Sequence, residues 1–124
     1  LDDRLGELTR QGRYSAAVLA DVQGLPLAAA GAKPHHESLA AVSSLVREMA
    51  TRARDLLPLS SPTLIEIVDA NDIGVRSRLF SAENETLVLT TLGNRLSPAD
   101  KVVEGLIASL PGIISTDESP PPGK

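Results

Sequence analysis

The stretch AAVLADVQGLPLAAAG at residues 16–31 decides the fold. Its first part lies in the segment Ser15–Val22, where an unbroken apolar run flanked by polar residues predicts a strand covered on both faces. The pair Gln23-Gly24 predicts a turn, and the apolar segment Leu25–Ala30 predicts a second strand. Pro26 lacks the backbone N–H that a central strand needs, so we expect the second strand at an edge of the sheet.

A helix is predicted on each side of this strand pair. Upstream, Leu1–Arg10 carries Leu1, Leu5 and Leu8 on one face at helical spacing. Downstream, after a loop at residues 31–37, Ser38–Leu57 is the longest predicted helix. Its apolar residues recur in steps of three and four, as in helices that pack lengthwise: Leu39, Val42, Val46, Met49, Ala53 and Leu56. Three further apolar residues widen the arc to roughly 140°, beyond the ~100° that packing on one surface requires, so we expect a second contact: Leu45, Ala50 and Leu57.

Three strands and a last helix are predicted after the long helix. The strands are Thr63–Val68, Ile73–Phe80 and Thr86–Leu92, with turns at residues 70–72 and 83–85. The last helix begins at Ser97, and its apolar face is expected at Ala99, Val102, Val103, Leu106, Ile107 and Leu110. Three consecutive strands require an antiparallel meander. The fold class is therefore α/β (α+β), with a single five-stranded antiparallel sheet flanked by helices on both faces in the order α-β-β-α-β-β-β-α.

Composition predicts one soluble domain with a protein partner. The 124 residues weigh 13.0 kDa and carry a formal net charge of −4, which argues against nucleic acid, whose phosphates require clustered positive charge. We expect residues 1–112 to form the domain and residues 113–124 a disordered Pro-rich tail. No long apolar run is present, so we expect no membrane insertion and a cytoplasmic location. The chain begins with Leu1 rather than Met, which leaves room for residues upstream.

No constellation of residues in the sequence predicts catalysis, a metal or a cofactor. His35 and His36 are adjacent in a loop without further ligands nearby, which favours a solvated or capping role. Asp69, Asn71 and Asp72 open like a calcium loop, but Phe80 stands where the bidentate acid belongs, so we interpret them as a turn. There is no Gly-rich phosphate-binding motif and no nucleophile elbow. We therefore expect a protein that is not an enzyme and holds no cofactor.

Charged residues offer two candidate contact surfaces. Arg47, Glu48 and Arg54 lie on the polar side of the long helix, either as a solvated face or as a rim that steers a protein partner. Arg76 and Arg78 share one face of a strand, where cross-strand pairing with Glu66 is favoured over docking.

The stretch at residues 16–31, followed by the long Ala- and Leu-rich helix and three strands, resembles the Roadblock/dynein light chain family. An apolar strand, an acid, a Gly turn and a second apolar strand ending in small residues carry the resemblance, which extends over Leu1–Leu110. It implies a profilin/Roadblock-like fold and a non-enzymatic regulator or scaffold that binds a Ras-like small GTPase, as bacterial relatives in gliding motility do. The Pro-rich tail departs from the family pattern.

The same resemblance implies a homodimer in which long helices pack together and third strands pair edge to edge. The implied interface is Leu39, Val42, Val46, Met49, Ala53 and Leu56 on the helix, with Thr63, Ile65 and Ile67 on the strand. Pairing would also protect an apolar edge strand from aggregation. The alternative is a small-molecule sensor built on the same kind of sheet, although few aromatic or convergent polar residues are available to line its pocket.

Overall fold

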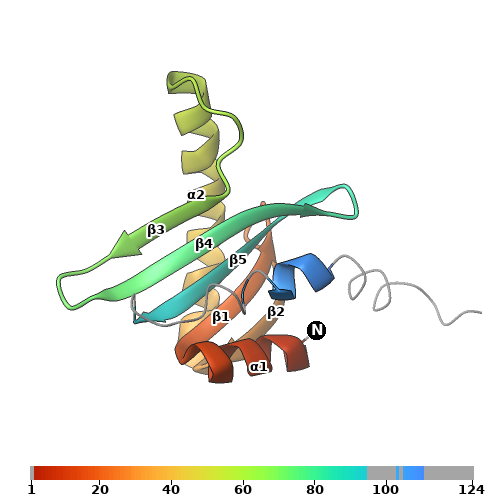
Figure 1. Cartoon of the computed structure of the whole chain (residues 1–124), viewed down its shortest axis with the longest axis vertical. Helices are drawn as coiled ribbons and strands as arrows, with labels where there is room; N and C mark the ends of the chain where they lie inside the picture. Colours follow the sequence, from red (N-terminus) through yellow and green to blue (C-terminus); the bar gives the residue numbers. More distant parts are fainter. Residues whose placement is uncertain (1, 95–102, 104, 111–124) are drawn as a thin grey trace, which may run out of the picture.

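The described part of the chain forms one five-stranded antiparallel sheet with helices packed against it (Figure 1). The computed structural model describes residues 2–94, 103 and 105–110. In chain order the elements are α1 (Asp2–Gly12), β1 (Tyr14–Asp21), β2 (Pro26–Gly31), the 3-10 helix η1 (Lys33–His35), α2 (His36–Leu56), β3 (Leu64–Val68), β4 (Ile73–Ala82) and β5 (Glu85–Asn94). The strands lie in the order β2-β1-β5-β4-β3. The predicted fold class is confirmed.

The segment that decides the fold forms one edge strand of the sheet and the strand next to it. β1 lies between β2 and β5, and its residues from Ala16 to Ala20 are fully buried, as expected for a strand covered on both faces. The Asp21 carboxylate accepts the backbone N–H groups of Gln23 and Leu25 and so closes the predicted turn. Gly24 adopts φ +85° in this turn, a conformation that glycine reaches without steric cost. β2 lies at the edge, as its proline predicted.

The two faces of the sheet carry separate hydrophobic cores. On one face α1 buries Leu5 and Leu8 against alternate residues of β1 and β5, together with residues of the last helix: Ala17, Leu19, Leu87, Leu89, Val103, Leu106 and Leu110. On the other face α2 buries Leu39 and Ala40 against Ala16, Val18 and Ala20. Helices therefore cover both faces, as predicted. The predicted start of the last helix, at Ser97 to Val102, and the tail at 113–124 lie outside the described residues.

Three buried hydroxyl groups join α2 to its face of the sheet. Thr90 Oγ1 lies 2.8 Å from Ser43 Oγ and 2.8 Å from Ser77 Oγ. Ser43 Oγ donates to the Leu39 carbonyl oxygen at 3.0 Å. Each hydroxyl has a single proton to donate. Because Ser43 donates to Leu39, Thr90 must donate to Ser43, and Ser77 must donate to Thr90. This chain fixes the position of α2 over β4 and β5.

A Thr90→Val variant is expected to lower the free energy of unfolding by about 1–3 kcal/mol. Valine keeps the shape of the side chain but removes the acceptor of Ser77 and the donor to Ser43, both of which are fully buried. Urea unfolding followed by circular dichroism measures the change. Thr86→Val, at an exposed site on the same strand, is the control and should change stability by less than about 0.5 kcal/mol. Equal stability of the two variants would contradict the hydroxyl chain.

The β4–β5 hairpin is tighter than the sequence predicted. Glu83 and Asn84 have φ values of 53° and 65°, so they form a two-residue turn with both residues left-handed. Ala82 and Glu85 pair across it, which extends β4 two residues beyond the predicted end at Phe80 and makes Glu85 the first residue of β5. None of the helices in the described ranges is long and apolar enough to span a membrane.

The second half of α2 extends past the sheet. α2 packs mainly against β1 and β5. Its last buried residue is Ala50, yet the helix continues to Leu56, which is 81% exposed. Figure 1 shows this half of α2 projecting beyond β3, the outermost strand on that side. Within the described part of the chain, α2 therefore has a covered half and an overhanging half.

Candidate functional site: the sides of the long helix

The side of α2 that faces the sheet is used within the protomer. Its buried residues are Leu39, Ala40, Ser43, Val46 and Ala50. Leu39 and Val46, which the sequence placed in a surface seam, are 3% and 2% exposed. That expectation is corrected for these two side chains, because the centre of the apolar arc is consumed in covering the helix's own sheet. The six residues that recur in steps of three and four therefore include some from the centre of the apolar arc, which faces the sheet, and some from its flank.

The remaining seam residues form an apolar flank of α2, defined as Val42, Met49, Ala53 and Leu56. At about 100° per residue these four side chains leave the helix within roughly 60° of one another. Met49 is 51% exposed and Leu56 is 81% exposed, whereas Val42 and Ala53 are half-buried. Leu45, 62% exposed, adjoins the flank. A row of large apolar side chains in water is the feature that typically marks a contact surface.

The outer edge of β3 is the second uncovered apolar feature. Among the described strands, β3 has β4 as its one neighbour, so one row of its backbone groups faces outward. Ile65 pairs with Ser77, a residue that belongs to the hydroxyl chain under α2, and Ile67 therefore lies on the same face. Ile67 is 56% exposed and Thr63 is also exposed. Open edges of this kind invite pairing with another strand.

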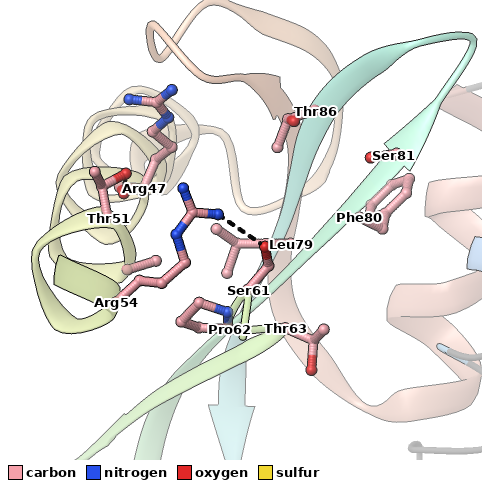
Figure 2. A pocket seen from close by; sticks show the side chains of 11 residues that line it. Arg47, Thr51, Arg54, Ser61, Pro62, Thr63, Leu79, Phe80, Ser81 and Thr86 are labelled. Atoms are coloured by element: carbon pink, nitrogen blue, oxygen red, sulfur yellow. Dashed lines mark hydrogen bonds between the residues drawn. The ribbon is translucent and has the colours of Figure 1, made fainter. Parts of the chain in front are cut away.

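A groove of mixed polar and apolar lining lies between the second half of α2 and the sheet. It has a volume of about 370 Å³ and is lined by Arg47, Ala50, Thr51, Arg54, Ser61, Pro62, Thr63, Leu79, Phe80, Ser81 and Thr86. We call it the arginine groove. Figure 2 shows Arg47 and Arg54 extending from the same helix, with the Arg54 guanidinium group directed toward Ser61 and the Arg47 guanidinium group lying farther from the start of β3. Arg54 Nη1 donates to Ser61 Oγ at 3.0 Å.

The three residues predicted to bind a partner do not lie together in the structure. Arg47 and Arg54 line one groove, whereas Glu48 lies elsewhere on the helix, 3.9 Å from Arg52 Nε in an exposed pair. Apart from Thr51 on α2 itself, the hydroxyl residues that complete the groove could not be found from the sequence, since they come from the loop after α2 and from both strands of the β4–β5 hairpin. Only the folded chain brings these segments together.

The other candidate residues have structural roles. His36 Nε2 lies 3.1 Å and 3.2 Å from the carbonyl oxygens of Ala30 and Gly31, so it donates there and ties α2 to the end of β2. Asp69 accepts the backbone N–H groups of Asn71 and Ile73, which confirms the predicted turn. His35 is exposed. Within the described ranges no group of three or more acidic or histidine side chains could hold a metal ion.

The predicted cross-strand pair on β3 and β4 is confirmed. Glu66 and Arg76 are register partners, and Arg76 Nε donates to Glu66 Oε2 at 2.8 Å. Arg76 Nη2 donates to the same oxygen at 2.5 Å. The pair lies on the face of the sheet opposite α2, away from the arginine groove. It therefore belongs to the fold rather than to the candidate site.

A second groove adjoins the first half of α2. It has a volume of about 870 Å³ and its lining is mostly apolar: Gln23, Gly24, Pro26, Ala29, His36, Glu37, Ala40, Ala41, Ser44 and Leu45. It runs beside the turn between β1 and β2. It contains none of the residues that the sequence singled out for partner binding.

Solved structures resemble this chain, although no family model matches it and no curated protein is similar in sequence. MglB of Myxococcus xanthus superimposes with a TM-score of 0.73 at 12% identity, over 98% of this chain and 92% of its own. The gliding protein MglB of Thermus thermophilus gives a TM-score of 0.65 at 22% identity, over 94% and 88% of the two chains. A Roadblock/LC7 domain from Streptomyces avermitilis gives 0.64 at 14% identity, over 89% and 97%. Identities this low establish the fold alone: the chain has the fold of a Roadblock-like domain.

Proposed function

We propose that this chain is a non-enzymatic, homodimeric module that binds and regulates a Ras-like small GTPase. The observation that carries the proposal is the pair of uncovered apolar features at one end of the sheet, the apolar flank of α2 and the open edge of β3. The fold shared with MglB, a gliding protein, supports it. Ras-like GTPases are the partners that the family resemblance implied.

The two uncovered features suit a second copy of the same chain. A two-fold axis beside β3 would pair this strand with its copy, continue the sheet and satisfy the outward backbone groups. Because α2 projects beyond β3, its overhanging half would then lie over the sheet of the second copy (Figure 1). Large side chains such as Met49, Leu56 and Ile67 would each contribute about 1.5–3 kcal/mol if fully buried. Of the interface residues that the resemblance implied, the proposed interface retains all except the buried Leu39 and Val46: Val42, Met49, Ala53, Leu56, Thr63, Ile65 and Ile67.

Light scattering after size exclusion tests the dimer directly. The expected mass at tens of micromolar protein is twice the 13.0 kDa of one chain. The mass should hold at high salt, because the proposed contact is apolar and its stabilisation is not screened. A single species of 13.0 kDa under these conditions would contradict the dimer.

Binding to a purified Ras-like GTPase from the same genome tests the regulatory role. Calorimetry with the GTPase loaded with GDP, and separately with a non-hydrolysable GTP analogue, should give affinities that differ between the two states, because a regulator must distinguish them. Turnover of GTP by the GTPase should change on adding the module, while the module alone releases no phosphate. Absence of binding in both nucleotide states, for every Ras-like GTPase of that genome, would contradict the proposal.

A further inference from the structure

Two arginines of the arginine groove have no carboxylate partner among the described residues. Arg52 pairs with Glu48, and Arg76 pairs with Glu66. Arg54 has only the Ser61 hydroxyl, which occupies one of the five N–H donors of its guanidinium group. No hydrogen bond or ion pair is found for the Arg47 side chain in the part of the chain that is described. Both cations therefore have donors available.

Among the described residues, the lining of the groove contains cationic, hydroxyl and apolar side chains but no acid. Besides the two arginines it offers five hydroxyl side chains: Thr51, Ser61, Thr63, Ser81 and Thr86. Glu83 and Glu85, in and beside the nearby hairpin turn, are absent from the lining, and Glu85 pairs with Ala82 on the face of the sheet away from α2. In a chain of net charge −4, the described lining of this groove carries two positive charges and no negative one.

From this charge pattern we propose that the arginine groove binds an acidic, extended segment of a partner protein. Carboxylates accept paired N–H groups from arginine, and hydroxyls can donate to the peptide backbone. Arg47 and Arg54 are seven residues apart, about 10.5 Å along the helix axis. In an extended segment, alternate side chains leave the same side at intervals of roughly 6.6 Å. Acids at alternate positions of a five-residue segment therefore span the two arginines.

Other anionic partners fit the groove less well. A nucleic acid would require a broad positive surface, and its bases require aromatic rings for stacking. The one aromatic side chain among the described lining residues, Phe80, packs against the core on the opposite face. This proposal specifies the kind of partner segment that the module binds. It rests on the proposed function only in taking the ligand to be part of a protein. It does not require the dimer, since the described lining residues belong to one chain and Thr63 alone among them also lies in the proposed dimer interface.

Titration with a synthetic peptide tests the groove. The probe is the acetylated and amidated peptide Glu-Thr-Glu-Thr-Glu, added to isotope-labelled protein while the arginine Nε–H signals are followed by NMR. The signals of Arg47 and Arg54 are expected to shift together, and the Arg52 signal to stay in place. The matched peptide Gln-Thr-Gln-Thr-Gln should shift none of them, and added salt should weaken the binding of the acidic peptide.

Matched variants assign the binding to the groove. Joint Arg47→Gln and Arg54→Gln substitution should weaken binding about 2- to 30-fold, the factor for losing two exposed ion pairs. Arg52→Gln removes the same charge from the same helix and should change the affinity less than about twofold. All these residues are exposed, so the variants are expected to fold, which circular dichroism verifies.

Three results would overturn the assignment. Equal loss of affinity in the Arg52→Gln variant would mean that general charge, rather than the groove, attracts the peptide. Tighter binding of inorganic phosphate than of the peptide would mean a site for a free anion. Loss of peptide binding in a monomeric Met49→Asp variant would mean a site shared between two copies. Failure of the proposed dimer or of GTPase binding would leave peptide binding to the single chain intact, so the two failures are distinguishable.

Discussion

A Val46→Asp variant is expected to lose its folded state. Val46 is 2% exposed and faces the sheet from the middle of α2, next to the hydroxyl chain at Ser43. An aspartate there would place a charge at a buried position, where the carboxylate cannot keep its hydration. The expected cost is about 4 kcal/mol or more, a large share of the roughly 5–15 kcal/mol that stabilises a domain. Loss of the cooperative urea transition is the measurement.

A milder change at the same position provides the control. Val46→Ala removes two methyl groups without adding charge and should remain folded with a lowered urea midpoint. This pair separates the effect of the charge from the effect of the cavity. A Val46→Asp variant that unfolds cooperatively at the wild-type midpoint would show that the side chain is not enclosed by its own protomer.

A Met49→Asp variant is expected to remain folded and to lose the dimer. Met49 is three residues from Val46 but lies on the apolar flank and is 51% exposed in the single chain. An aspartate there stays hydrated in the monomer, so the fold should survive. In the proposed dimer the same carboxylate would be buried against the second copy at a cost of several kcal/mol. Light scattering should give 13.0 kDa, with an unchanged circular dichroism spectrum.

The matched control for this variant lies two residues away on the same helix. Thr51→Asp introduces the same charge at an exposed position that lines the arginine groove. It should remain a dimer and should weaken binding of the acidic peptide. Dissociation of the Thr51→Asp dimer, or a Met49→Asp variant that remains a dimer, would contradict the assignment of the apolar flank to the interface.

Much of the fold could be predicted because local pattern and tertiary packing agree. The apolar run in β1 predicted a strand covered on both faces, and it is fully buried. Pro26 predicted the edge position of β2. The β4–β5 turn was predicted too long, since Asn84 favours the left-handed conformation but Glu83 does not, and a two-residue turn of this type needs both residues left-handed.

The candidate site was harder to predict than the fold. Periodicity gave the apolar arc of α2, but it could not separate Val46, which covers the sheet, from Met49, which faces water. That division depends on where the sheet ends beneath the helix. In the same way, Arg47 and Glu48 are adjacent in the sequence, yet only Arg47 lines the groove, and the hydroxyls opposite come from distant segments.

The overhang of α2 makes the amide exchange of this part of the helix depend on the concentration of the protein. After Ala50 the helix has little sheet beneath it, so in a lone chain its amide hydrogens should exchange with solvent faster than those of the first half. If a second copy covers the overhang, mass action makes that protection rise with concentration. Amide protection at the end of the helix would then measure the fraction of chains that are dimeric. This protection would decrease on dilution, while the protection of β1 would stay the same.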